Sequence, residues 1–165
     1  LDAPLEAITG SANGVSGTVV FDPENPAATR GKIVVTAASL HVPNPVMKDH
    51  LHGAQWMNVA QYPEIVFEAR ELKNARTTGD VTTAEVAGAF TVKGVTKEMT
   101  VPVRFTYLKD KLAARGGNQP GDLLVLRSNF TIKRSDFGIN PGAPQDKVAD
   151  EIAISLSIAG AAPRQ

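Results

Sequence analysis

Apolar and polar residues alternate along much of this chain with a period of two, which is the pattern of β-strands with one buried face. The longest example runs from Glu85 to Tyr107, where alternate positions are apolar on both sides of a Lys93-Gly94 turn. This pattern predicts a β-hairpin with one apolar side. Because two strands cannot bury such a side alone, the chain must supply more sheet or a second layer to cover it.

Other segments supply further strands and one helix. We expect a weak strand over Leu5 to Gly10, and clearer strands over Gly17 to Phe21, Lys32 to Leu40, Glu64 to Leu72, Leu123 to Lys133 and Ile152 to Ile158. Asn44-Pro45 predicts the start of one short helix near residues 45–53, because Asn is a favoured N-cap and Pro suits the first helical position. Asn74 to Asp80 is predicted to be a polar turn, and Leu108 to Asp122 a long, mobile loop rich in Gly.

The order of these elements predicts an all-β fold. About eight strands with a single helix and no internal repeat favour a closed antiparallel eight-stranded barrel, with a sandwich as the less favoured alternative. The 165 residues are most simply one domain, 1–165. A barrel of about eight strands is just wide enough to be filled by its own side chains or to hold one small ligand.

The composition of the chain and the motifs that it lacks argue against several classes of function. Seventeen Lys and Arg balance seventeen Asp and Glu, with no basic run longer than Lys133-Arg134, so we expect no nucleic-acid partner. No apolar run approaches the roughly 20 residues that span a bilayer. Local nucleophile, phosphate and zinc motifs are absent, which favours a protein that is not an enzyme.

Three histidines, His41, His50 and His52, are close in sequence and suggest a metal site at first sight. On a helix, however, positions two apart point about 200° away from each other. No carboxylate or thiolate stands at a suitable ligand spacing, and the chain has no cysteine. We therefore expect no metal and no cofactor.

Four motifs resemble those of the YceI-like family. They are His50-Leu51 with Trp56-Met57-Asn58 and Tyr62 to Phe67, then Gly88 to Lys97, then Arg134 to Ile139, and Val148 to Ile152. Their order and spacing match the family over roughly Gly14 to Ala159. One departure is that Met47 and Lys48 stand where the family usually has Arg and Asp, so any polar clamp formed by that pair is altered here.

The resemblance implies a lipocalin-like barrel whose lumen binds a long apolar ligand without catalysis. In relatives this ligand is a polyisoprenoid, such as a polyprenyl phosphate or a quinone tail. The resemblance also implies a periplasmic or secreted protein and leaves a cytoplasmic location open. A sequence that starts at Leu1 rather than Met is compatible with a removed signal peptide or with a trimmed chain. A homodimer is compatible with the family.

The candidate ligand-binding residues come from the inward apolar positions and from the helix region, which we place at or near the entrance. They are Met47, His50, Leu51, Trp56, Met57, Phe67, Phe90, Val101, Val103, Phe105, Tyr107, Phe130, Phe137, Ile154 and Leu156. On the helix, His50 is expected to face the sheet and His52 to face outward.

A second set of motif residues is predicted to have structural roles, with Gly and Pro acting through backbone geometry: Pro63, Gly88, Gly94, Arg134, Asp136 and Gly138. In this set, Arg134 and Asp136 flank a turn that an Arg–carboxylate hydrogen bond would hold beside the barrel mouth.

Periodicity does not decide whether the lumen is filled or hollow, because the same apolar residues can either pack closely or line a cavity. The alternative to a carrier is a filled barrel that acts as a protein-interaction or stress-related module through its loops, above all Lys109 to Asp122. A weaker alternative is a hydrolase or isomerase with His50 as the base, which needs a second catalytic group that the spacing does not identify.

Overall fold

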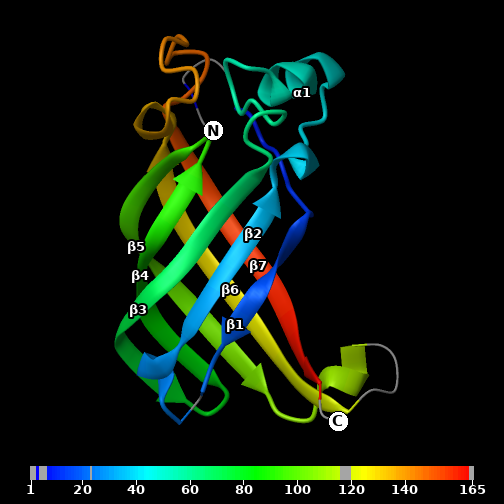
Figure 1. Cartoon of the computed structure of the whole chain (residues 1–165), viewed down its shortest axis with the longest axis vertical. Coiled ribbons are helices and arrows are strands. Elements are labelled where there is room, and N and C mark those ends of the chain that lie inside the picture. The colour runs from blue at the N-terminus through cyan, green and yellow to red at the C-terminus, as the bar shows by residue number, and fades with distance from the viewer. Residues whose placement is uncertain (1–2, 4–6, 23, 116–119, 164–165) are drawn as a thin grey trace.

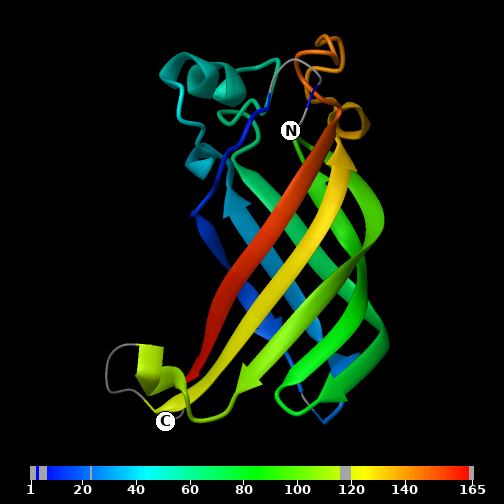
Figure 2. The same ribbon diagram turned by 180° about the vertical axis from the view of Figure 1, so that it is seen from behind.

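The computed structural model describes residues 3, 7–22, 24–115 and 120–163. Its seven strands form one antiparallel sheet in which each strand pairs with the next along the chain. The strands are β1 (Val15–Val20), β2 (Arg30–Thr36), β3 (Glu64–Thr78), β4 (Val81–Val92), β5 (Val95–Leu108), β6 (Gly121–Lys133) and β7 (Glu151–Pro163). The sheet curls into a tall barrel (Figures 1 and 2). The predicted all-β antiparallel barrel is confirmed.

The barrel is nearly closed rather than closed, because β1 and β7 share no ladder of pairs in the described part of the chain. The predicted count of eight strands is corrected to seven. Leu5 and Glu6 of the expected first strand lie outside the described residues, and within residues 7–14 only Ala7 and Ser11 form isolated bridges, Ser11 with His41. This segment is rich in Gly and polar residues and has little apolar surface with which to anchor a strand.

The predicted central hairpin is present as β4 and β5, whose register is unbroken from Val81–Thr106 to Val92–Val95. Its two-residue turn has positive φ at both Lys93 (50°) and Gly94 (76°), which matches the type I′ turn that suits twisted hairpins. A Cβ on Gly94 would lie 2.6 Å from the ring of Tyr62, so the close approach of that ring also requires glycine.

The polar turn predicted over Asn74 to Asp80 is wrong, since β3 continues to Thr78 and the turn is Gly79-Asp80. The register with β4 shifts twice along the way, between Ala69 and Glu71 and between Lys73 and Arg76. The residues from Lys73 onward remain exposed. Backbone pairing, which a hydropathy pattern does not report, therefore extends this strand.

The helix α1 (Pro45–His52) begins as predicted. The Asn44 side chain accepts hydrogen bonds from the backbone N–H groups of Val46 (3.0 Å) and Met47 (3.1 Å). Four short 3-10 helices are η1 (Pro26–Ala28), η2 (Ala37–Ser39), η3 (Leu112–Arg115) and η4 (Arg134–Phe137). We call the barrel end that carries α1 the upper end, as drawn in Figure 1, and the end with η3 and the β3–β4 turn the lower end. Among the described residues, every helix is too short or too polar to cross a membrane.

Candidate functional site

The inner wall of the barrel is built from alternate residues of the strands, and these residues form two apolar clusters. The lower cluster consists of Leu72, Ala84, Val86, Val101, Phe105, Leu124 and Leu126. The upper cluster consists of Met57, Phe90, Val92, Ile132, Phe137 and Ile139. Phe67, Met99 and Phe130 are partly buried and pack against both clusters, so the apolar interior is continuous along the barrel.

The strand residues predicted to face the lumen lie at inward positions. Phe90, Val101 and Phe105 are buried members of the two clusters. The others are half-buried: Phe67, Val103, Tyr107, Phe130, Ile154 and Leu156. The prediction omitted several inward residues that carry the same alternation, such as Leu72, Ala84 and Leu126. The prediction thus identified the inward face of the strands but not all of the residues on it.

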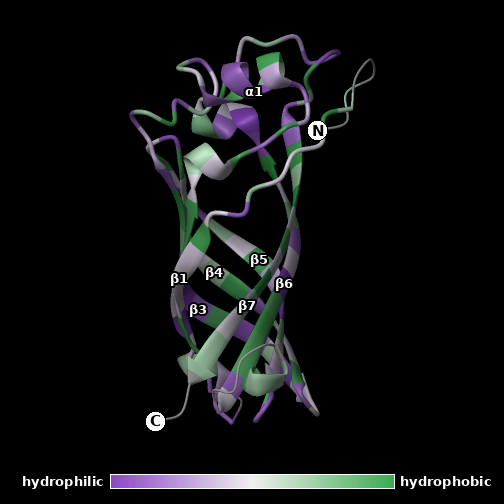
Figure 3. Ribbon diagram, turned by 90° about the vertical axis from the view of Figure 1, so that its right-hand side faces the viewer, coloured by the Kyte–Doolittle hydropathy of each residue, from purple (hydrophilic) through white to green (hydrophobic). Residues whose placement is uncertain are grey.

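One side of the inner wall is incompletely covered. Along β7 the inward residues Ile152, Ile154, Leu156 and Ile158 are all half-buried. On β2, the inward Ile33 and Val35 are half-buried as well. β1 and β7 flank the line along which the barrel is not paired (Figure 3). Apolar surface on this side of the barrel is therefore accessible.

The upper end of the barrel is closed. Members of the upper cluster expose only 3–7% of their surface, and the Phe90 ring packs edge-on against Phe130 and Phe137, with centroids 6.0 and 5.7 Å apart. Met57 lies within this cluster, and Leu51 and Trp56 pack against it. The expectation that the helix region forms an entrance is therefore not supported at this end, because its apolar residues complete a packed core.

The predicted orientation of the α1 histidines is wrong. His50 is exposed, whereas His52 is half-buried with its Nε2 atom 2.7 Å from the carbonyl oxygen of Leu40. This contact with the segment after β2 turns His52 toward the barrel. Met47 is half-buried on the helix. Among the described residues no group of three His, Asp or Glu side chains is arranged to hold a metal ion.

Arg134 organises the upper end. Its side chain is 1% exposed and donates to four backbone carbonyls: Ala149 (2.7 Å), Ile139 (2.9 Å), Asn140 (2.7 Å) and Val148 (3.0 Å). Its guanidinium carbon lies 5.5 Å from the ring centroid of Trp56. The predicted Arg–carboxylate bond is thus replaced by carbonyl contacts that join η4 to the segment before β7. Asp136 is exposed.

Lys93 holds the tip of the central hairpin against the same region. Its ammonium donates to the carbonyl oxygens of Gln55 (3.3 Å) and Gly138 (3.1 Å). Burial lowers the pKa of Lys93, because the surrounding protein replaces part of the water that stabilises its charge. Lys93 and Arg134 are therefore both committed to backbone carbonyls.

The remaining motif residues act through the backbone, as predicted from their residue types. The carbonyl of Pro63 accepts from the N–H of Ala37 (2.8 Å) just before β3 begins. A Cβ on Gly88 would lie 2.3 Å from the Glu68 carbonyl oxygen, so β3 and β4 approach closely there. Gly138 ends η4 in the left-handed conformation with φ 66°.

Asp150 fixes the start of η4 and provides a pH-dependent contact. Its carboxylate accepts from the hydroxyl (2.7 Å) and the backbone N–H (2.9 Å) of Ser135. The Ser135 hydroxyl, followed by its N–H, lowers the pKa of Asp150, and the charges of Arg134 and Lys133 lower it further. The ionised carboxylate therefore stabilises the fold above its ordinary pKa, and this stabilisation is lost as the pH falls through the lowered pKa.

Replacing Asp150 with Asn should consequently lower the free energy of unfolding at neutral pH. The difference from wild type should shrink as the pH is lowered past the Asp150 pKa, because both side chains are then uncharged. Urea titrations at a series of pH values measure this difference. Asp146→Asn is the matched control, since Asp146 is exposed in the same segment. A difference that is independent of pH would contradict the role assigned to the carboxylate.

The lower end is closed by aromatic and threonine side chains. The rings of Phe21 and Phe105 are stacked, with centroids 4.8 Å apart and planes 5° apart. Thr29 and Thr82 are each 2% exposed. Thr82 Oγ1 lies 2.8 Å from Thr77 Oγ1, whereas Thr29 Oγ1 has no hydrogen-bond partner among the described residues.

A buried hydroxyl without a partner costs about 1–3 kcal/mol. Thr29→Val should therefore raise the free energy of unfolding by about 1 kcal/mol, because it removes that hydroxyl and keeps the branched shape. Thr82→Val should lower it by about 1 kcal/mol, because it leaves Thr77 without its partner. Chemical denaturation of both variants checks the pair. A loss of stability in Thr29→Val would mean that the hydroxyl does have a partner in solution.

These features define a class of protein: a β-barrel with a continuous apolar interior, packed at both ends and accessible at the side. The sequence profile described as the YceI-like domain matches residues 3–160. The chain therefore belongs to the YceI-like family, as its motifs predicted.

Individual relatives agree with this assignment. A UPF0312 protein of Yersinia pestis is 32% identical over 152 residues, which cover 92% of this chain and 72% of that protein. The solved YCEI protein of Campylobacter jejuni superposes with a TM-score of 0.78 at 19% identity, covering 96% of this chain and 86% of its own. BcnA of Burkholderia cenocepacia gives a TM-score of 0.72 at 25% identity, covering 92% and 86%. The two structures confirm the barrel fold.

Proposed function

We propose that this protein is a non-catalytic carrier of a long-chain apolar ligand, a polyisoprenoid of the polyprenyl phosphate or quinone type, held along the inside of the barrel. The observation that carries the proposal is the half-buried inward row of β7, from Ile152 to Ile158, which leaves apolar surface uncovered inside a barrel of this family. A periplasmic or secreted location, where lipids must cross an aqueous space, fits the same role.

The energetics of such a ligand favour binding without specific polar contacts. Each methylene that moves from water to an apolar surface contributes roughly 0.8 kcal/mol. A chain of many carbons is therefore held strongly by a wall made of Ile, Leu, Val and Phe. A depression of about 250 Å³ is lined by facing residues of β6 and β7, namely Asn129, Phe130, Thr131, Ala153, Ile154 and Ser155. Four of these six residues are exposed, so this depression lies at the outer surface and does not measure the space inside the barrel.

Mass spectrometry of an organic extract tests the proposal directly. Protein purified without detergent should yield a stoichiometric long-chain apolar species that is absent from a mock preparation. Native mass spectrometry of the same sample should show the corresponding mass increase on the intact protein. An unliganded mass that is unchanged after incubation with polyprenyl lipids and quinones would contradict the carrier function.

A further inference from the structure

β5 and β6 pair over only five residues, from Arg104–Arg127 to Leu108–Leu123, although both strands continue toward the upper end. Residues 95–103 of β5 and 128–133 of β6 have no ladder between them. Pro102 explains where the pairing stops, because proline has no N–H to donate. The Ser128 hydroxyl donates to the carbonyl of Pro102 at this point. In the upper half of the barrel, the sheet is therefore interrupted between β5 and β6, which are both inner strands of the sheet.

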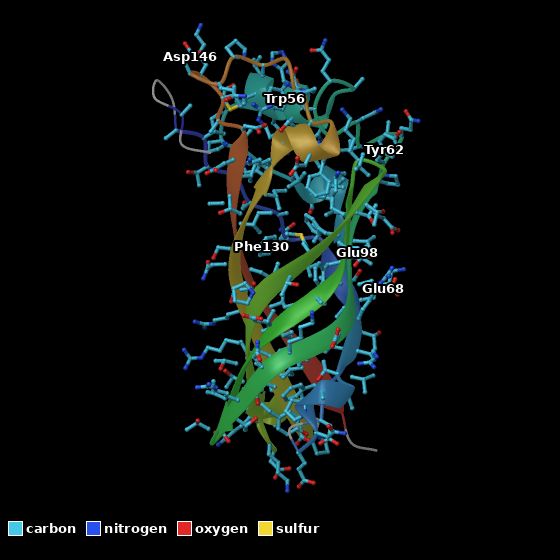
Figure 4. All side chains as sticks on the ribbon, turned by 90° about the vertical axis from the view of Figure 1, so that its left-hand side faces the viewer. Trp56, Tyr62, Glu68, Glu98, Phe130 and Asp146 are labelled. Carbon is cyan, nitrogen blue, oxygen red and sulfur yellow. The ribbon has the colours of Figure 1, made fainter. Side chains whose placement is uncertain are left out.

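The two strands that border the gap each carry an inward apolar side chain. Met99 of β5 and Phe130 of β6 are both half-buried and both pack against the upper and lower clusters. Figure 4 looks onto this side of the barrel and labels Phe130 on β6 and Glu98 on β5. Because no ladder joins β5 to β6 at this level, displacement of these two side chains opens a direct path to the inner wall.

One cation belongs to the inward row of β5 beside the gap. The inward row of β5 contains apolar and aromatic residues with one charged exception: Val95, Lys97, Met99, Val101, Val103, Phe105 and Tyr107. Lys97 lies opposite Phe90 of β4, on the same face of the sheet. Its side chain is exposed and forms no hydrogen bond or ion pair with the residues that the structure describes.

The neighbouring charges do not neutralise Lys97. Glu98 points to the outer face, where its carboxylate lies 3.1 Å from Nη1 of Arg70. At the upper end, Lys93 and Arg134 already bind backbone carbonyls. Lys97 is thus a cation with free donors, located where the apolar interior meets water.

We propose that the gap between β5 and β6 is the entrance of the lumen and that Lys97 binds an anionic head group of the ligand there. This rests on the carrier function proposed above and narrows its ligand to apolar chains with an anionic head, such as polyprenyl phosphate, in preference to neutral quinones. The tail passes between Met99 and Phe130 to the inner wall, and the head remains in water beside the Lys97 ammonium.

Paired lipids test the head-group contact. The wild type should bind a polyprenyl phosphate about fivefold more tightly than the polyprenol of the same length, since an exposed ion pair contributes up to about 1 kcal/mol. Lys97→Ala should abolish this preference without changing the affinity for polyprenol. Lys97→Glu should reverse it, and Lys97→Arg should keep it. Lys73→Ala, which removes an exposed lysine from the outer face of β3, is the matched control.

The outcomes separate the two proposals. If both lipids bind and Lys97→Ala leaves the preference intact, the head-group assignment is overturned while the carrier function stands. If neither lipid binds the wild type, both are overturned. Millimolar inorganic phosphate should not displace the lipid, because the tail supplies most of the affinity. Displacement by inorganic phosphate would overturn the lipid assignment and leave a site for the free anion.

Cross-linking tests the entrance itself, since the chain has no cysteine of its own. Cysteines at the exposed positions Thr100 and Thr131, joined by a bis-maleimide, should slow lipid uptake about tenfold or more, as expected when a gating motion is blocked. Cysteines at Thr18 of β1 and Ser157 of β7, joined in the same way, provide the control across the other unpaired line. Slow uptake with the second link alone would place the entrance between β1 and β7 and overturn this assignment.

Discussion

Replacing Arg134 with Met should lower the free energy of unfolding by about 4 kcal/mol, which is near the upper limit for a single substitution. The guanidinium donates to the carbonyls of Ile139, Asn140, Val148 and Ala149, and within the described part of the chain no other side chain donates to these four oxygens. A buried carbonyl that loses its donor costs about 1–3 kcal/mol, and the four costs do not add fully because the segment can relax toward water.

Two companion variants define the cause. Arg134→Lys should lower the unfolding free energy by about 2 kcal/mol, because one ammonium cannot reach carbonyls that a planar guanidinium spans. Arg127→Met removes an exposed arginine from β6 and should change stability by less than about 0.5 kcal/mol. Urea unfolding followed by circular dichroism measures all three.

The fluorescence of Trp56, the one tryptophan in the chain, gives a local readout because the guanidinium lies over its ring. In Arg134→Met the emission of Trp56 should change even under conditions where the barrel remains folded. Wild-type stability in Arg134→Met would show that the segment before β7 does not depend on this residue.

The role of Arg134 also shows a limit of reading the sequence. The motif from Arg134 to Ile139 predicted a fixed turn and suggested a carboxylate partner, and the turn is present. The guanidinium binds carbonyls instead, which every residue carries and which no side-chain pattern reveals. The actual partner of Ser135 is Asp150, a residue from the segment before β7 that only the fold brings near.

The central hairpin and the helix start were predictable because their signals are local. Lys93-Gly94 suits a tight turn, and Asn44 caps α1, whatever the rest of the chain does. The lower part of β3 and the short β5–β6 ladder were not predictable by hydropathy. Both depend on how far two backbones stay paired, and alternation within each strand says nothing about that distance. Pro102 is a sequence signal for the gap, because proline has no N–H to donate to a neighbouring strand.

The closed ends and the divided wall have a common consequence for ligand binding. The upper end is held by Arg134 and Lys93, and the lower end by the stacked rings of Phe21 and Phe105. A ligand that enters from the side must then lie against inward residues of the middle of the barrel. A substitution of one of these residues should have the largest effect on ligand affinity and the smallest effect on the packing of the two barrel ends.

Replacing Val103 with Arg should therefore abolish retention of the apolar ligand, with a loss of affinity of about 100-fold or more. Val103 lies opposite Ala84 on the inner face, is half-buried and packs against the lower cluster. A guanidinium at this position would have to be desolvated by the incoming tail, at a cost of several kcal/mol. Organic extraction with mass spectrometry, and titration with polyprenyl phosphate, measure the loss.

Two further variants make this result interpretable. Thr78→Arg places the same charge at an exposed position of β3, away from the β5–β6 gap, and should leave retention unchanged. Val103→Trp adds volume without charge and should weaken binding of long tails by occupying the space that they need. Circular dichroism of each variant establishes that the barrel is folded. If a folded Val103→Arg protein retains its ligand as the wild type does, the ligand does not lie in the lumen, and the interaction-module alternative based on the Lys109 to Asp122 loop becomes the better account.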